Sequence, residues 1–210
     1  ITARAEQYGT TRGWRMGPVS AALLAPHVQT LEVQLLAWSP GTNNRPVDGE
    51  AVVVPAFADS NAANRWLATT RGKYVLVSAP EIMCRAPQEL ERYARPATVT
   101  NINAQRQAVT QNYQSRYTAF GNLQQLVQKL QAAGVAAVVT TNWSGGWGVN
   151  KIFGSNTDRI PSIDLSCEHY GMIWRLASNN QGPRMRLTAD AEARPDQPMF
   201  NVIAELKGTQ

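Results

Sequence analysis

The chain has 210 residues, of which 43% are hydrophobic and 17% charged, a composition and length that suit one globular domain with short arms. Its net charge is +5, but no two Lys or Arg residues are adjacent and the cations are spread along the whole chain, which argues against a phosphate-binding surface. No apolar run approaches the roughly 18 residues that a membrane span needs. We therefore expect neither a nucleic-acid partner nor a membrane span.

The N-terminal part of the chain is predicted to be an arm followed by a turn. Residues 1–38 read as an arm with one apolar patch, Leu31 to Trp38, that could pair as an edge strand. Residues 39–46, Ser-Pro-Gly-Thr-Asn-Asn-Arg-Pro, form a turn-rich hinge.

The segment 85–120 has an unusual composition. Residues 87–93 predict a short helix with Pro at its start. The following stretch, 102–117, is rich in Gln, Asn and Arg and has few apolar anchors. It is either a solvated helix over the sheet or an arm that docks on a domain outside this chain. We favour the second interpretation, because large aromatic side chains are costly to leave exposed without a partner; those in question are Tyr113, Tyr117 and Phe120.

The stretch 122–190 has the clearest pattern of all. Four leucine and valine residues between 123 and 130 fall on one helical face, and Gly134 follows where a helix end needs a left-handed residue. Residues 135–141 and 160–165 predict two buried strands, and 184–190 a third strand. Ser166 can cap the helix between the last two, with an inner face formed by Tyr170, Ile173, Trp174 and Ala177.

A glycine-rich loop separates the first two of these strands. Trp143, Trp147 and Phe153 lie in it, and aromatic side chains on a flexible loop suit a recognition surface. We therefore expect Trp143, Trp147, Asn150 and Phe153 to bind a substrate or a partner. The alternative is that the tryptophans fold back as a lid on the core of the domain itself.

The two cysteines, Cys84 and Cys167, both follow predicted strands and could meet. Two buried thiols are the preferred interpretation, because free cysteine is among the most buried residues. The alternative is a disulfide, which an exported protein would permit, since disulfides persist in oxidising compartments.

The residues that metal or nucleophilic catalysis would need are missing. A zinc peptidase uses three or four His, Asp or Glu ligands and a general base. This chain has two histidines, His27 and His169, and Glu168 beside His169 would point about 100° away from it on a helix. His169 is expected to be a satisfied surface or half-buried residue. No cofactor, metal site or catalytic residue is expected within the chain.

The order of the elements resembles the protease-associated domain, a non-catalytic module inserted into or attached to secreted and membrane peptidases. The matching pieces are Leu130–Val139, Ile160–Ile163, Tyr170–Trp174 and Met185–Leu187, with 50–54 and 71–77 upstream.

The two ends carry a second resemblance. Residues 198–208, Pro-Met-Phe-Asn-Val-Ile-Ala-Glu-Leu-Lys-Gly, look like the strand that opens the catalytic domain of zinc aminopeptidases and related carboxypeptidases. Residues 36–42 are similar to the segment that enters the insert in carboxypeptidase Q-like members.

These resemblances imply a mixed α/β fold, an open β-sandwich or barrel of about seven strands flanked by helices. Residues 1–38 would be the N-terminal arm and 39–192 the protease-associated domain. Residues 193–210 would be an exit linker and the first strand of a catalytic domain outside the chain.

The implied function is that of a non-catalytic part of a secreted or periplasmic zinc-dependent exopeptidase, an aminopeptidase or a carboxypeptidase Q-like enzyme. Such a part shapes access to the active site and contacts the substrate or the neighbouring domain. Zinc is expected in the catalytic domain of the same polypeptide, which is the expected partner together with a peptide substrate. The alternative is a self-standing module that recognises peptide or carbohydrate through the Trp143/Trp147 loop.

Overall fold

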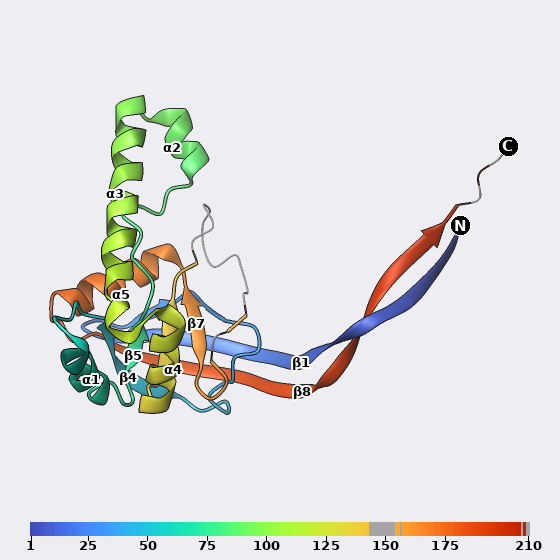
Figure 1. Ribbon diagram of the computed structural model, residues 1–210, viewed down its shortest axis with the longest axis horizontal. Helices are drawn as coiled ribbons and strands as arrows, with labels where there is room; N and C mark the ends of the chain where they lie inside the picture. The colour runs from blue at the N-terminus through green and yellow to red at the C-terminus, as the bar shows by residue number, and fades with distance from the viewer. Residues whose placement is uncertain (143–153, 156, 207, 209–210) are drawn as a thin grey trace.

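The computed structural model describes residues 1–142, 154–155, 157–206 and 208, and its architecture is mixed α/β (Figure 1). Within the described residues, eight strands form one sheet, with five α-helices and one 3₁₀ turn around it. The elements in chain order are β1 (Thr2–Ala25), β2 (Gln29–Leu31), β3 (Val33–Leu35), β4 (Val47–Val53), α1 (Ser60–Ala68), β5 (Tyr74–Leu76), α2 (Pro87–Tyr93), α3 (Pro96–Ser115), η1 (Thr118–Phe120), α4 (Leu123–Ala133), β6 (Ala137–Thr140), β7 (Ser162–Leu165), α5 (Cys167–Ser178) and β8 (Arg184–Glu205).

The sheet curls until its two edges almost meet. The strand order is β2-β1-β8-β4-β5-β6-β7-β3, in which β4, β5, β6 and β7 are parallel and the other pairs are antiparallel. The edge strands β2 and β3 are separated along the chain by Glu32 alone. The two edges must therefore lie next to each other, and the sheet forms a nearly closed barrel. The predicted barrel-like α/β fold is confirmed, and the apolar patch that begins at Leu31 does supply edge strands.

Strand residues alternate between two hydrophobic cores, because successive side chains of a strand point to opposite faces. Tyr74 and Leu76 of β5 are fully buried in the core that α5 completes. Val75, between them, is fully buried in a second core on the other face. Phe120 and Leu130 close that second core, bringing η1 and α4 against the sheet.

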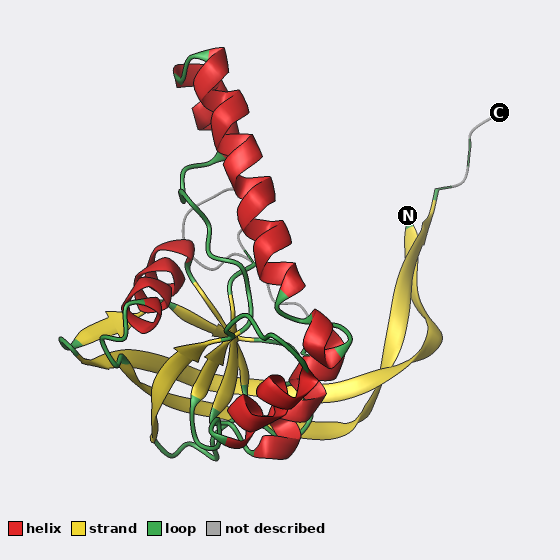
Figure 2. Ribbon diagram, turned by 60° about the vertical axis from the view of Figure 1, so that its left-hand side comes forward, coloured by secondary structure: helices red, strands yellow, loops and turns green. Residues whose placement is uncertain are grey.

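Two long strands extend from the body as a twisted ribbon. β1 and β8 pair antiparallel from Ala25↔Arg184 out to Thr2↔Glu205, and the outer half carries no third strand (Figures 1 and 2). Their register shifts at four places, including Gln7/Gly9 and Thr11/Gly13, and such bulges increase twist and bend a ribbon. Residues 193–198, where the sequence predicts a linker, lie within β8.

A second projection is formed by α2 and α3 (Figures 1 and 2). The helix predicted at 87–93 is confirmed as α2, and α3 stands out from the body over most of its length. The expectation that this segment leaves large aromatic side chains exposed without an external partner is wrong. Tyr113, Tyr117 and Phe120 are 2%, 8% and 4% exposed and belong to the second core of this chain.

Candidate functional site

A groove of about 590 Å³ lies where the base of α3 approaches α5. The loop that follows β5 forms its third wall. Most of the lining is apolar, with Pro80 and Ile82 from the loop, Val109 and Tyr113 from α3, and Trp174 from α5. The volume falls within the range of roughly 300–1,000 Å³ that is common for ligand pockets.

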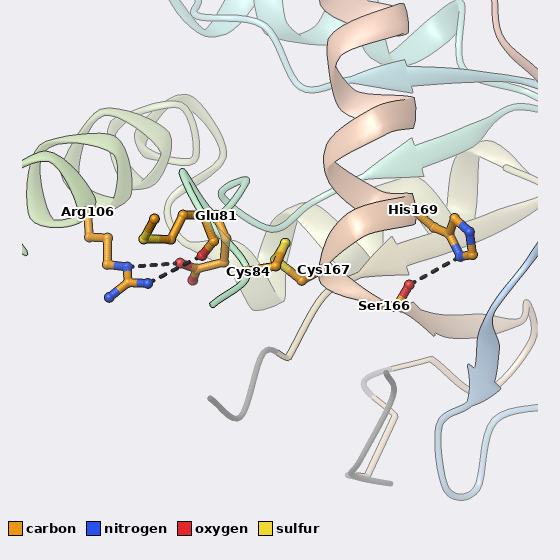
Figure 3. The surroundings of a disulfide bond; sticks show 7 residues. Glu81, Cys84, Arg106, Ser166, Cys167 and His169 are labelled. Carbon is orange, nitrogen blue, oxygen red and sulfur yellow. Dashed lines mark hydrogen bonds and ion pairs between the residues drawn. A yellow bond between two sulfur atoms is a disulfide. The ribbon is translucent and has the colours of Figure 1, made fainter. Parts of the chain in front are cut away.

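The loop wall of the groove is fixed to α5 at two points. At its start, Ser78 N donates to the Tyr170 hydroxyl at 2.9 Å, and that hydroxyl donates to Ser78 O at 2.6 Å. Further along, Cys84 forms a disulfide with Cys167, the first residue of α5 (Figure 3). The preferred prediction of two buried thiols is therefore wrong. A loop tied at both ends loses less conformational entropy when a ligand binds beside it.

An ion pair closes the loop side of the groove. Arg106 Nε of α3 lies 3.5 Å from Glu81 Oε2, and Arg106 Nη2 donates to Met83 O at 3.3 Å (Figure 3). Burial raises the pKa of the Glu81 carboxyl, and the charge of Arg106 opposes that rise. Among the described residues, the one acidic side chain of the lining is thereby engaged by a cation of α3.

The base of α3 is anchored by an aromatic and a cation. The Tyr113 hydroxyl donates to Leu76 O at 2.6 Å, and burial raises its pKa to about 12. Arg116 lies over the Tyr113 ring, 4.8 Å from its centroid, and donates from Nη1 to Val54 O at 2.7 Å. These contacts fix the floor of the groove to β5 and to the segment after β4.

Arg175 of α5 also contributes a positive charge to the lining of the groove. Among the described residues, its guanidinium has no hydrogen-bond or ion-pair partner. The side chain lies over Gly171, one turn earlier on the same helix, where an added Cβ would come within 3.2 Å of Arg175 Nη1. A glycine inside a helix costs about 1 kcal/mol relative to alanine. Its presence here leaves room for the guanidinium on the wall of the groove.

A buried carboxyl lies elsewhere, between β6 and β7. Asp164 is 2% exposed, and its Oδ1 accepts hydrogen bonds from Thr140 Oγ1 at 2.8 Å and Asn142 Nδ2 at 3.0 Å. Burial raises the pKa of the Asp164 carboxyl, and these two hydrogen bonds oppose that rise. Asp164 therefore tends to keep its proton to a higher pH than an exposed aspartate.

The two histidines make structural contacts. His169 is half-buried; its Nδ1 accepts from Glu32 N at 2.9 Å and lies 3.1 Å from the Ser166 hydroxyl. Its Nε2 contacts the amide of Gln29, which also contacts His27. This confirms that His169 is a satisfied residue. Within the described part of the chain, no three His, Cys, Asp or Glu residues gather in a group that could hold a metal ion.

The binding residues predicted from the sequence, Trp143, Trp147, Asn150 and Phe153, lie outside the described residues, so their role stays a prediction. The groove was not predicted, because its members come from three separated segments. Gly171 inside a helical pattern was the one local signal, since such a glycine often has a packing or functional reason.

The outer half of the β1–β8 ribbon has one apolar face. Opposed residues of an antiparallel pair lie on the same face. One face carries the pairs Ala3↔Ala204, Ala5↔Val202 and Gln7↔Phe200, and the other carries Arg4↔Ile203 and Glu6↔Asn201. Val202 is 78% exposed and Phe200 is 52% exposed. Arg4 Nη2 lies 3.9 Å from Glu6 Oε2, and Arg4 Nη1 lies 3.8 Å from Glu205 Oε1, so the opposite face is the charged one.

Comparison with curated proteins finds relatives of this chain. The chain is 23% identical over 197 residues to carboxypeptidase Q of Xenopus laevis. The alignment covers 94% of this chain and 36% of the relative. Human carboxypeptidase Q is also 23% identical over 197 residues, covering 94% and 35%. The chain therefore spans about a third of the length of these relatives. No family model matches it.

Solved structures show the same architecture. The peptidase M28 precursor from Shewanella amazonensis has a TM-score of 0.56 at 17% identity, covering 99% of this chain and 42% of that one. The aminopeptidase from Aneurinibacillus sp. strain AM-1 has a TM-score of 0.52 at 14% identity, covering 96% and 37%. The chain is thus similar in sequence to carboxypeptidase Q and similar in fold to these peptidase structures. None of the helices within the described residues has the length and apolar character that a membrane crossing requires.

Proposed function

We propose that this chain is the non-catalytic protease-associated domain of a zinc-dependent exopeptidase, either an aminopeptidase or a carboxypeptidase Q-like enzyme. In this role it contacts the catalytic domain of the same polypeptide and shapes the path of peptide substrates to the active site. Zinc belongs to the catalytic domain, because the histidines described here are occupied by structural contacts.

The β1–β8 ribbon carries the proposal. A two-stranded ribbon is marginally stable in water and needs a third strand or a packed face. The outer half of this ribbon has neither among the described residues, yet it presents Phe200 and Val202 together on one face. A catalytic domain packed on that face would bury them and hold the module in place.

The disulfide supports the proposed location. Disulfides form and persist in secreted and periplasmic proteins and are rare in the cytosol. The Cys84–Cys167 bond joins the groove loop to α5, and it would be retained in an exported peptidase. We propose a secreted or periplasmic enzyme.

The test compares two substitutions on opposite faces of the same strand. Val202→Lys places a charge on the apolar face, and Asn201→Lys places the same charge on the other face, where the side chain is also exposed. In the full-length protein, Val202→Lys should lower the melting temperature and the peptidase activity, whereas Asn201→Lys should leave both nearly unchanged. Equal tolerance of the two substitutions would contradict a contact at this face.

The non-catalytic role is tested on the 210-residue chain. It should show no hydrolysis of aminoacyl anilides or dipeptides with added zinc, and neither zinc nor a chelator should shift its melting temperature, because a structural zinc couples directly to folding. Metal-dependent hydrolysis by this chain alone would overturn the assignment.

A further inference from the structure

The groove between α3 and α5 offers apolar walls and few free polar groups. Glu81 pairs with Arg106, the Tyr113 hydroxyl donates to Leu76 O, and Asn112 Oδ1 accepts from Arg116 Nη2 at 3.3 Å. A ligand with many hydrogen-bonding groups would give up its hydrogen bonds to water on entering the groove. Few groups of the lining could replace them, and each unpaired group would cost binding free energy. The side chains of the lining therefore suit a ligand with a largely apolar body.

One charged group of the lining stays available to a ligand. Arg175 has no hydrogen-bond or ion-pair partner among the described residues, and its guanidinium lies along the wall over Gly171. Arg116 adds a second positive charge nearby, and the one acidic residue of the lining is already paired. The sequence has no Asp or Glu between Arg92 and Thr157, so α3 brings no further negative charge to the groove. The local charge favours an anion.

We propose that this groove binds an apolar monocarboxylate. Its alkyl or aryl body lies against Val109, Tyr113 and Trp174, and its carboxylate accepts hydrogen bonds from the Arg175 guanidinium. The guanidinium offers a planar pair of donors that matches a carboxylate. Gly171 borders the site, because an added Cβ there would come within 3.2 Å of Arg175 Nη1 and the guanidinium would have to shift slightly. This site is separate from the ribbon and does not depend on the function proposed above.

Isothermal titration calorimetry on the 210-residue chain tests the chemical class with three probes. Octanoate should bind, and octanamide, which has the same chain without the charge, should bind at least about tenfold more weakly. Acetate, which has the charge without the apolar body, should also bind at least about tenfold more weakly. Equal binding of octanoate and octanamide, or no octanoate binding at millimolar concentration, would overturn the proposal. An acetylated tripeptide with an apolar C-terminus that bound more tightly than octanoate would overturn it in favour of a peptide site.

Variants locate the site. Arg175→Met should weaken octanoate about tenfold or more, as expected for loss of a charge-assisted hydrogen bond. Its matched control is Arg65→Met, since Arg65 of α1 is also exposed and is outside the groove. Ala108→Trp should fill the groove and abolish binding, whereas Ala97→Trp, three turns away on the same face of α3, should not. Equal effects of a variant and its control would place the ligand elsewhere and refute the assignment.

Discussion

The Tyr170 hydroxyl exchanges two hydrogen bonds with the backbone of Ser78, accepting from its N–H at 2.9 Å and donating to its carbonyl at 2.6 Å. This pair joins α5 to the point where β5 ends and the groove loop begins. Ser78 N lies in a part-buried region and Tyr170 is fully buried, so water cannot easily replace the phenol. The start of the loop wall thus depends on one side chain of α5 for its placement, while the disulfide holds the loop further along.

Tyr170→Phe should lower the free energy of unfolding by about 1–3 kcal/mol, because two polar backbone groups lose their partner in a buried place. Tyr93→Phe serves as the control, since Tyr93 is 69% exposed on α2. Urea denaturation followed by circular dichroism measures both. A loss below about 0.5 kcal/mol for Tyr170→Phe would show that the phenol does not hold the loop.

The helix, its terminal glycine and the strand of the unit from α4 to β6 were predicted from the sequence, whereas its N-cap was not. Asn122 is the N-cap, with its side chain accepting from Gln125 N at 2.9 Å, and Gly134 ends the helix with φ +77°. A left-handed residue at this position favours glycine. Leu126 and Leu130 are fully buried as their spacing predicts. Local signals suffice here, because helix, cap and strand follow one another along the chain.

Substitutions in this unit check its packing. Leu126→Ala should destabilise the chain by about 2–5 kcal/mol, and Val138→Ala should also destabilise it, because each removes methyl groups from the second core. Leu123→Ala, on the same helix but 37% exposed, should cost much less. Chemical denaturation measures all three. Similar small losses at every position would mean that α4 does not pack on β6.

The features that the sequence did not reveal depend on pairing between distant segments. β1 contains Gly9, Gly13, Gly17 and Pro18, which read as turn residues, yet it runs for 24 residues because β8 pairs along its length. Proline within β8 is tolerated, since a strand at the edge of a two-stranded ribbon needs no donor on its outer side.

Tertiary packing also determines where the aromatic residues in the last turn of α3 and just after it are buried. Tyr113 and Phe120 were read as anchors for an external partner, but α4 and β5 bury them within this chain. The proposed Arg175 site could not be predicted from the sequence for the same reason, because the walls of the groove come from α3, α5 and the loop between β5 and α2.

The disulfide provides a third test. Replacing both Cys84 and Cys167 by Ser should cost about 2–5 kcal/mol of stability, as is typical for loss of a native disulfide. Reductant should destabilise the wild-type chain by a similar amount and leave the double variant unchanged. Thiol titration in denaturant without reductant should find no free thiol in the wild type. Two titrating thiols would restore the interpretation of buried free cysteines.

The buried carboxyl of Asp164 predicts a dependence of stability on pH. Burial raises the pKa of Asp164 in the folded state above its unfolded value, so folding favours the protonated form. The stabilisation from that form is fully present below the unfolded pKa, near 4, and is lost as the pH rises through the folded pKa.

Asp164→Asn should remove this dependence while keeping an oxygen that can accept from Thr140 and Asn142. The unfolding free energy of the variant minus that of the wild type should therefore increase as the pH rises from about 4 through the folded pKa. Urea denaturation at several pH values measures it, with the exposed Asp196→Asn as the control for general charge effects. A difference that stays constant, or falls, as the pH rises would show that the hydrogen bonds from Thr140 and Asn142 outweigh burial and keep Asp164 ionised.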